Sequence, residues 1–391
     1  MSARHVVIIG GGYAGIMAAN RLAGSNQDMQ VSVINPVSDF VERIRLHEVA
    51  AGARATAGVP MSSLLSGRVD FIEDSASRID PENRRVYLSS GRSPVAYDVL
   101  LYSVGSGQAS PRVPDAAYGF GNAESATRLR GRLARLGQGA TVSIVGAGLT
   151  GIELAAEVAQ QHPELRIRLI SRGLIAGDLS ASGAKAVRVR LAVLGIDMVE
   201  NADVQRCDNS TVSTSEGITL PSDCTVWAAG FTVPRLARDS GLPTDAEGRL
   251  VVDESLSSPD YPDIFGAGDA ARVPDSVGHH LRMSCATALP LGAHAADSII
   301  ARLENRAPGP LSAGYMIRCI SLGRRSGVIQ TVTAADRPRQ FVVRGRLAGL
   351  AKEQICRMTL SWLRGELRRS GSFIWPKGPL PADVSVPVEA G

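Results

Sequence analysis

Two stretches of the chain repeat one pattern of apolar and small residues. The first is 5-HVVIIGGGYAGIMAANRL-22 and the second is 141-TVSIVGAGLTGIELAAEV-158. Each opens with a run of β-branched and aliphatic residues, which predicts a buried strand, and closes with an apolar pattern that suits a helix. A glycine-rich turn lies between them. We therefore expect the same strand, turn and helix unit twice in one chain.

The glycines of each turn have the spacing G-x-G-x-x-G. The first glycine permits the tight turn, the second lets the backbone approach a pyrophosphate at the helix N-terminus, and the third allows close packing of helix on strand. Two such turns predict two dinucleotide sites, one for a flavin and one for a nicotinamide; two coincidental turns in an α/β protein are the alternative. The six glycines are Gly10, Gly12 and Gly15 in the first copy and Gly146, Gly148 and Gly151 in the second.

Apolar runs elsewhere predict further strands, and one long pattern predicts an amphipathic helix. The expected strands are 31–36, two within 69–88 joined by a turn at 81–83, 97–106, 225–231, 316–323 and 326–332. The segment 263–271 is expected to form a strand followed by the start of a helix at Asp269. Residues 347–368 are expected to form a long helix, and the Pro- and Gly-rich segment 107–119 a crossing between domains.

These elements predict an α/β fold with two Rossmann-like dinucleotide-binding domains and a small C-terminal domain. We expect a discontinuous FAD-binding domain at 1–110 and 240–305. The NAD(P)H-binding domain, 111–239, is expected to be inserted between these two parts. Residues 306–391 then form an interface or substrate domain.

Composition narrows the function further. The net charge is +4 and the basic residues are dispersed, so we expect no nucleic-acid partner. No run of eighteen apolar residues and no signal peptide is recognisable, which predicts a cytoplasmic protein without a transmembrane helix. The five cysteines have no C-x-x-C spacing and form no Cys/His cluster, so we expect reduced packing thiols and no metal.

In each unit, the residues at the C-terminal end of the second strand determine which nucleotide ribose is recognised. An acid is usual 20 residues beyond the third glycine, where it binds ribose; here Asn35 stands there, and its amide is still able to bond ribose hydroxyls. In the second unit Ser171 and Arg172 replace the usual acid. Serine with arginine suits a 2′-phosphate, so we expect NADPH in preference to NADH. A solvated surface arginine is the alternative.

The chain resembles the superfamily of flavoproteins with two dinucleotide-binding domains, which includes glutathione reductase, ferredoxin reductases and type II NADH dehydrogenases. The resemblance rests on the paired glycine motifs, on Val104-Gly105-Ser106 and Trp227-Ala228-Ala229-Gly230, and on Gly266-Ala267-Gly268-Asp269. It implies that the first glycine motif binds FAD, that Asp269 contacts the ribityl chain, and that the second motif takes the nicotinamide nucleotide. Further expected cofactor-binding positions are Ala14, Arg43, Ala76, Gly105, Thr150, Gly230 and Gly268.

Within the superfamily, 46-LHEVAAG-52 and 149-LTGIELA-155 resemble segments of the type II NADH dehydrogenases. This resemblance implies that Glu153 lies beside the nicotinamide, and that His47 and Glu48 lie near the flavin ring. A histidine there suits proton delivery, so His47, Glu48 and Glu153 are the expected catalytic residues, with Arg43 and Arg45 as partners for an anion. A packing role for His47 is the alternative.

One segment departs from the type II pattern. The family has three glutamines that line the quinone site, and the matching stretch 285-CATALPLG-292 has Ala286, Pro290 and Leu291 instead. The paired cysteines of disulfide reductases are also missing. The expected function is transfer of hydride from NADPH to FAD and then to a small unsaturated or quinonoid acceptor. A membrane quinone reductase, or a reductase of a ferredoxin-like partner or a redox sensor, are the alternatives.

The helix at 347–368 has apolar residues that we expect near one face, with arginines beside them. These are Leu347, Leu350, Ile355, Met358, Trp362 and Leu363. Such a face suits burial in a core or a homodimer, which we expect, or contact with an anionic membrane surface, the alternative.

Overall fold

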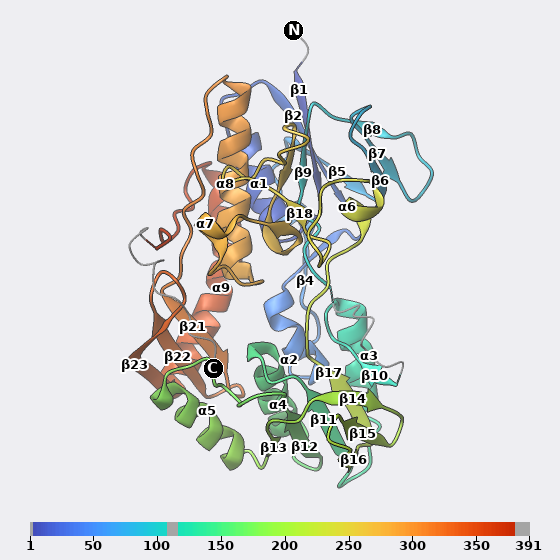
Figure 1. The fold of residues 1–391 in the computed structure, drawn as a ribbon, viewed down its shortest axis with the longest axis vertical. Coiled ribbons are helices and arrows are strands. Elements are labelled where there is room, and N and C mark those ends of the chain that lie inside the picture. Colours follow the sequence, from blue (N-terminus) through green and yellow to red (C-terminus); the bar gives the residue numbers. More distant parts are fainter. Residues whose placement is uncertain (1–2, 108–115, 380–391) are drawn as a thin grey trace.

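The computed structural model describes residues 3–107 and 116–379, and most of the expected domain crossing at 107–119 lies outside these ranges. Figure 1 shows two parallel sheets at opposite ends of the long axis, with a long helix and a smaller sheet along one side of the molecule. The two glycine turns belong to different sheets.

The first sheet has five parallel strands and takes in a segment from late in the chain. Because β19 pairs with β9, the chain returns to this sheet after it has formed the second one. Buried residues fill four of the six positions of β1, as expected for a central parallel strand. The strand order is β19 (Ile264–Gly266), β9 (Val99–Tyr102), β1 (Arg4–Ile9), β2 (Met29–Asn35) and β5 (Val69–Glu73).

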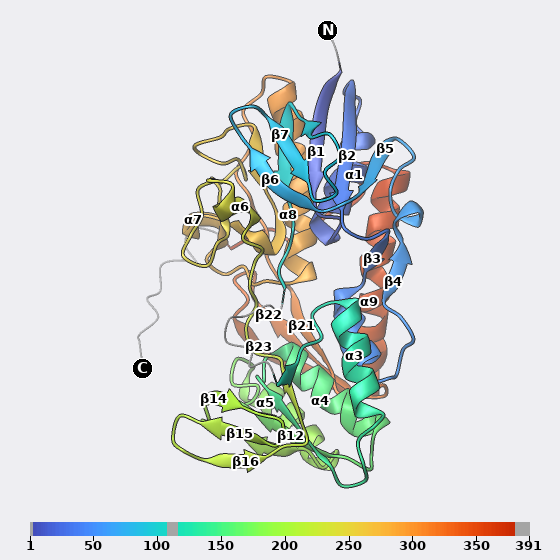
Figure 2. The same ribbon diagram turned by 90° about the vertical axis from the view of Figure 1, so that its right-hand side faces the viewer.

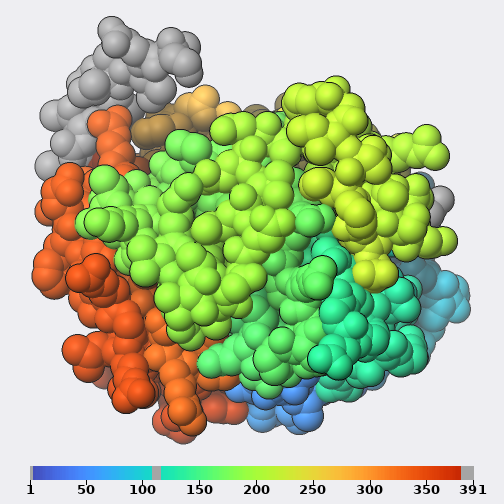
Figure 3. All heavy atoms as spheres, turned by 90° about the horizontal axis from the view of Figure 1, so that it is seen from below, coloured from blue at the N-terminus to red at the C-terminus, as the bar shows by residue number. Residues whose placement is uncertain are grey.

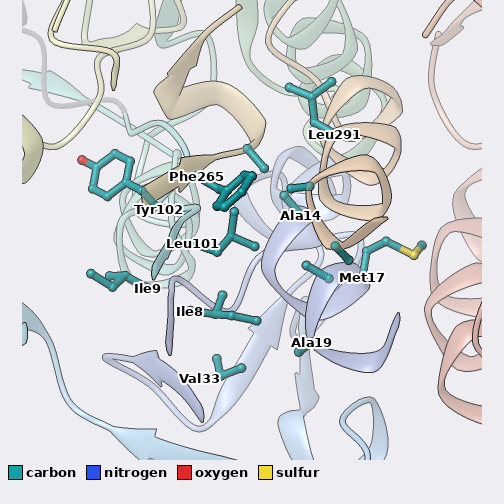
Figure 4. Packing of buried hydrophobic residues seen from close by; sticks show 14 of the residues in the cluster. Ile8, Ile9, Ala14, Met17, Ala19, Val33, Leu101, Tyr102, Phe265 and Leu291 are labelled. Atoms are coloured by element: carbon teal, nitrogen blue, oxygen red, sulfur yellow. The ribbon is translucent and has the colours of Figure 1, made fainter. Parts of the chain in front are cut away.

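Two helices, α1 (Tyr13–Ala23) and α8 (Cys285–Leu303), pack tightly beside this sheet. Figure 4 shows Ile8, Leu101 and Phe265 of the strands facing the small side chains of α1, with Leu291 of α8 beyond them. A Cβ on Gly292 would lie 2.2 Å from the carbonyl oxygen of Ala14, so the two helix backbones touch. Small residues at this crossing therefore bring α8 against the turn that holds Gly12.

The second sheet repeats the arrangement. Its strands are parallel, and the helix after its glycine turn packs on it in the same way. The strand order is β10 (Ala117–Tyr118), β17 (Cys224–Trp227), β11 (Thr141–Val145), β12 (Arg166–Ile170) and β13 (Asp197–Val199). The helices of this region are α3 (Ala123–Leu133), α4 (Leu149–Gln161) and α5 (Ala181–Val193), and a small antiparallel sheet is formed by β14 (Val204–Cys207), β15 (Thr211–Thr214) and β16 (Thr219–Pro221).

The C-terminal part joins the two ends of the molecule. An antiparallel sheet of β21 (Ile317–Ser321), β22 (Gly327–Val332) and β23 (Pro338–Gly345) packs beside α4 and α5. Helix α9 (Arg346–Arg368) then runs from this sheet to α1, as Figure 2 shows. It therefore bridges the two nucleotide-binding regions.

Short elements complete the fold. The strands are β3 (Asp39–Val41), β4 (Gly58–Pro60), β6 (Ala76–Asp80), β7 (Arg85–Leu88), β8 (Val95–Ala96), β18 (Leu250–Val251) and β20 (Ala271–Arg272). The helices are α2 (Leu46–Ala50), α6 (Leu236–Asp239) and α7 (Asp275–Gly278), with single 3-10 turns at Arg43–Arg45, Met61–Ser63 and Gly268–Ala270.

Two expectations about elements are wrong. Residues 69–88 form three strands, because the chain bends at Asp74, whose carboxylate accepts hydrogen bonds from the backbone of Ser75 and the hydroxyl of Ser90. No α-helix begins at Asp269, where one 3-10 turn leads directly into β20. The long helix α8 starts only at Cys285, where the Ser284 side chain accepts a hydrogen bond from the N–H of Thr287.

The expected apolar face of α9 is also wrong. Leu363 is fully buried, whereas Leu347 and Leu350 are 72% and 70% exposed. Leu347 and Leu363 are sixteen residues apart, which turns them about 160° from each other on a regular helix. The apolar residues therefore divide between a buried side and an open side.

Candidate active site

One cavity of about 2740 Å³ runs between the two sheets and reaches both glycine turns. Most of the expected site residues line it, although they come from distant parts of the chain. Those that line it are Gly10, Gly12, Ala14, Asn35, Arg43, His47, Gly105, Gly146, Gly148, Thr150, Glu153, Ser171, Arg172, Gly230, Gly268 and Asp269. The lining does not include Gly15, Glu48, Ala76 and Gly151.

The first turn has the shape that a bound pyrophosphate needs. Gly10 has a φ of 105°, a region that L side chains rarely adopt. A Cβ on Gly15 would lie 1.9 Å from the carbonyl oxygen of Gly10, so the helix is in direct contact with the turn. No described atom lies within 4 Å of a Cβ on Gly12, so this backbone is open to the cavity.

The second turn matches the first closely. Gly146 also has a φ of 105°, and a Cβ on Gly151 would again lie 1.9 Å from a carbonyl oxygen, that of Gly146. A Cβ on Gly148 meets no described atom within 4 Å. Each turn therefore leaves an open cradle before a helix N-terminus, where backbone N–H groups and the helix dipole favour a phosphate.

An unsatisfied carboxylate oxygen lies near the first cradle. Ser106 Oγ donates a hydrogen bond of 2.6 Å to Oδ2 of Asp269, and the guanidinium of Arg43 donates to the Ser106 carbonyl oxygen at 2.6 Å. Oδ1 of Asp269 is buried and has no hydrogen-bond partner among the described residues. A buried acceptor without a donor is costly, so the site suits a hydroxyl-bearing ligand. The Asp269 position thus fits the ribityl chain of FAD.

Asn35 is used within the protein. Its Oδ1 accepts a hydrogen bond from the N–H of Gly11 at 2.9 Å, and its Nδ2 donates to the Val37 carbonyl oxygen at 2.7 Å. One end of the amide therefore holds the first turn against the end of β2, and the other end holds the loop that follows β2. Ala76, which was expected to bind the cofactor, does not line the cavity. It lies in the separate antiparallel sheet of β6, β7 and β8.

His47 and Glu153 meet at the cavity wall, together with Lys352 of α9. Lys352 Nζ lies 3.0 Å from Oε1 of Glu153, which also accepts a hydrogen bond from the N–H of Ser321 at 2.9 Å. Burial opposes charge on Glu153, but Lys352, His47 and Ser321 hold its pKa below the usual value. Burial lowers the pKa of His47, and its buried Nε2 has no partner among the described residues.

Glu48 lies behind this wall in a cluster of ion pairs. Its Oε1 accepts from Arg45 and from Arg324, each at 2.8 Å, and its Oε2 accepts from Arg54 at 3.1 Å. Burial opposes its charge, but the hydrogen bonds from Arg324 and Arg45 hold the pKa of Glu48 below its usual value. Arg45 also binds Glu353 of α9, so this network ties α2 to the C-terminal helix.

Ser171 and Arg172 line the cavity at its end near the second glycine turn, and they follow β12 directly in the sequence. The Ser171 N–H donates to the Val199 carbonyl oxygen, which fixes the strand end, while the Arg172 side chain is exposed. Arg206 of β14 lines the same cavity. Figure 3 shows that residues of this second region and of β21–β23 form the face seen from below.

The remaining wall is mostly apolar. Ala286 and Pro290 of α8 line the cavity, whereas Leu291 is directed into the first core. Ile355, Met358 and Trp362 of α9 also line the cavity. Apolar walls with few polar groups are typical of sites for small organic ligands.

Sequence reasoning missed Lys352, a mostly buried cation at the cavity wall. The chain contains only three lysines, so each of them merits attention. A signal was present: Lys352 falls on the buried stripe of α9, one turn from Ala348 and one turn from Cys356. A lysine on such a stripe is buried only with a partner, which is Glu153.

The chain belongs to the pyridine nucleotide-disulphide oxidoreductase family, whose model matches residues 4–288. It is an FAD-dependent NAD(P)H oxidoreductase. An NADH dehydrogenase-like protein of Mycobacterium tuberculosis is 30% identical over 381 residues, which cover 90% of this chain and 92% of that protein. A type II NADH:quinone oxidoreductase of the same organism is 29% identical over 315 residues, with 69% of this chain and 68% of that protein covered.

The fold is also found among solved structures. A sulfide:quinone oxidoreductase from Aquifex aeolicus superposes with a TM-score of 0.80 at 22% identity, and 94% of this chain and 93% of that chain are covered. Within residues 3–107 and 116–379, no helix combines the length and the apolar character needed to cross a bilayer.

Proposed function

We propose that the chain oxidises NADPH and passes the electrons to a small, apolar organic acceptor of unsaturated or quinonoid type. The continuous cavity carries this proposal, because it joins the two open cradles to an apolar wall. When bound, FAD would accept hydride from the nicotinamide and release electrons to the acceptor. The protein would supply binding, orientation and protons.

The assignment of the two cradles follows from their surroundings. The first cradle lies beside Asp269, whose buried free oxygen suits a ribityl hydroxyl, so we place FAD there. The second lies beside Ser171 and Arg172, which suit the 2′-phosphate of NADPH. We also propose the domain boundaries given above, with β19 returning to the first sheet as their support. The homodimer stays a prediction.

Proton handling falls to the His47 and Glu153 pair. Both line the cavity, whereas Glu48 does not and is held by three arginines. We therefore assign Glu48 the role of orienting α2 and its neighbour His47. Between proton transfers, Glu153 is held by Lys352 as a carboxylate at the wall, and this negative charge favours the cationic ring that the nicotinamide becomes on oxidation.

A membrane quinone reductase is the second candidate. It is favoured by the similarity to a type II NADH:quinone oxidoreductase and by the exposure of Leu347 and Leu350 on α9. The matching α8 positions speak against it, since Ala286 and Pro290 give the wall no amide to orient a quinone carbonyl.

Anaerobic reduction of the purified protein, followed by reoxidation, tests the proposal. We expect NADPH to bleach the flavin absorbance faster than NADH, and small apolar acceptors to restore it. H47A should slow reoxidation more than reduction, and E48Q should have the smaller effect. Rapid reoxidation by a long-chain menaquinone in liposomes, and its loss when residues after Leu347 are deleted, would instead establish the quinone reductase.

A further inference from the structure

A second buried carboxylate lies behind Glu153 on the same helix. Glu157 is one turn further along α4 and is 0% exposed. Residues four apart share one face of a helix and are separated by about 6 Å along its axis. Glu153 lines the cavity and Glu157 does not. Helix α4 therefore carries one carboxylate at the wall and another one turn behind it.

Glu157 has an incomplete set of partners. Gln161 Nε2 donates to its Oε1 at 3.4 Å, and Arg324 Nε lies 3.9 Å from the same oxygen. Its Oε2 is buried and has no hydrogen-bond partner within the described ranges. An ionised carboxylate in such surroundings is unfavourable, and a protonated one is not.

The charged groups around Glu157 act on its pKa in both directions. It faces Arg324 from the β21–β22 turn, Glu48 from α2 and Glu153 from its own helix. Burial raises the pKa of the Glu157 carboxyl to about 7, opposed by Arg324 and reinforced by the carboxylates Glu48 and Glu153. Near neutral pH this group holds a proton that it can release.

The neighbouring groups Glu153, His47, Lys352 and Tyr13 at the wall, and Glu48 behind it, offer no such proton. Glu153 and Glu48 have pKa values below their usual range, so both are ionised, and burial lowers the pKa of His47, so it is neutral. Despite the burial that opposes its charge, Lys352 has a pKa well above its usual value, and burial raises that of Tyr13, so both hold their protons firmly. The net reaction nevertheless consumes one proton, because NAD(P)H, an acceptor and H⁺ give NAD(P)⁺ and the dihydro form of the acceptor.

A short route joins Glu157 to solvent. Its hydrogen-bond partner Gln161 is exposed at the C-terminal end of α4. The order from solvent to cavity is therefore Gln161, Glu157 and Glu153, each one helical turn from the next.

We propose that Glu157 takes up a proton from solvent at the Gln161 end of α4 and transfers it to Glu153 at the cavity wall, beside His47. In this step an O–H bond of Glu157 breaks, an O–H bond on Glu153 forms, and Glu157 is protonated again from solvent; no electrons move. Glu157 acts through Glu153 and is a positioning residue. The inference rests on the proposed function, which supplies the demand for the proton.

E157Q tests the relay, because it keeps the size of the side chain and removes the exchangeable proton. Turnover is measured from pH 6 to 8.5 with menadione, whose reduction takes up a proton, and with ferricyanide, which takes only electrons. The menadione to ferricyanide ratio should fall by on the order of tenfold in E157Q and lose the pH dependence near pH 7 that the wild type has. E164Q is the matched control, since it removes the same charge from an exposed residue just beyond α4.

A second measurement does not depend on turnover. Infrared difference titration of the oxidised, flavin-containing protein without nucleotide should show one protonated carboxyl that ionises near pH 7 in the wild type and in E164Q, and not in E157Q. E157D keeps a carboxyl group but places it one methylene closer to the helix backbone, so it should restore part of the menadione to ferricyanide ratio. If E157Q and E164Q share one ratio and one pH profile while the wild type turns over, the relay alone is wrong. If neither nucleotide reduces the wild type, the proposed function fails and the relay fails with it.

Discussion

Helices α1 and α4 follow turns of the same geometry, yet they bury different side chains. The fifth residue after the second glycine of each motif is Met17 in α1 and Glu153 in α4, and the ninth is Arg21 and Glu157. Met17 lies in the apolar core against the first sheet, and Arg21 reaches a partly exposed ion pair with Asp297.

The difference between Met17 and Glu153 shows which feature of this helix the fold requires and which feature serves the reaction. Met17 shows that the strand, turn and helix unit is satisfied by an apolar residue at the Glu153 position. Burying a carboxylate there costs free energy unless a counterion is present. Its presence beside Lys352 therefore points to a role for the charge itself. Four experiments test this contrast between the two helices and the sites that they border.

The largest effect is expected from a side chain placed in each cradle. G12L should yield protein without flavin, with FAD affinity weaker by on the order of 100-fold or about 3 kcal/mol, because the open backbone before α1 becomes blocked. G148L should keep the flavin and lose NAD(P)H binding by a similar factor. Flavin absorbance per protein and nucleotide titration measure the two. G67L is the control, since Gly67 is equally open but lies outside the cavity; full flavin retention by G12L would contradict the assignment.

The next effect concerns the buried ion pair. K352M should lower the free energy of unfolding by about 3–5 kcal/mol, because it leaves Glu153 buried without its counterion. The double variant K352M/E153M, which makes α4 resemble α1 at this position, should recover most of the loss. Urea unfolding at pH 7 gives the free energy of unfolding of each variant. If the double variant loses as much stability as K352M and E153M lose together when measured singly, the two residues are not coupled.

A smaller effect is expected from Glu157. Burial raises its pKa from 4.5 to about 7 in the folded protein. Between these pH values the unfolded chain binds fewer protons than the folded one, so the free energy of unfolding falls as pH rises and levels off above pH 7. E157Q should abolish this fall and be more stable than the wild type at pH 8 by about 2–4 kcal/mol. Parallel stability curves for the two proteins from pH 4.5 to 8 would contradict it.

The smallest effect is expected at the strand end after β12. R172A should weaken NADPH binding by about 1.5–3 kcal/mol and leave NADH nearly unchanged, because a charge-assisted hydrogen bond to the 2′-phosphate is lost. Titration calorimetry with both nucleotides measures the difference. An equal loss for both would leave Arg172 as a surface residue.

Local patterns were enough to predict the two glycine turns, the strands around them and the long helix α9. The spacing of Gly10, Gly12 and Gly15 determines a turn within six residues, so no distant contact is needed to recognise it. The turn at 81–83 was predicted, but the break between β5 and β6 was missed. The Asp74 carboxylate makes that break through hydrogen bonds from Ser75 and Ser90, and a side-chain cap of this kind leaves no apolar signature.

The site was only partly predictable for a related reason. The His47 and Glu153 pair was found through motifs, but Lys352 joins it from a helix about two hundred residues after Glu153. Periodicity gives the buried stripe of α9 and does not say which element covers it. Asn35 shows the same limit, since its hydrogen bonds to Gly11 and Val37 depend on the loop that follows β2.

Helix α9 has a consequence for the order of events during synthesis. Arg45 binds Glu353, 308 positions later, and Lys352 completes the wall beside His47. A nascent chain forms both cradles before α9 leaves the ribosome, since domains fold as they emerge. During that interval the cradles are formed while the charge at Glu153 has no counterion. The helix that completes the wall of the cavity is therefore also the last part of the site to be translated, so the site is finished only when almost the whole chain has been made.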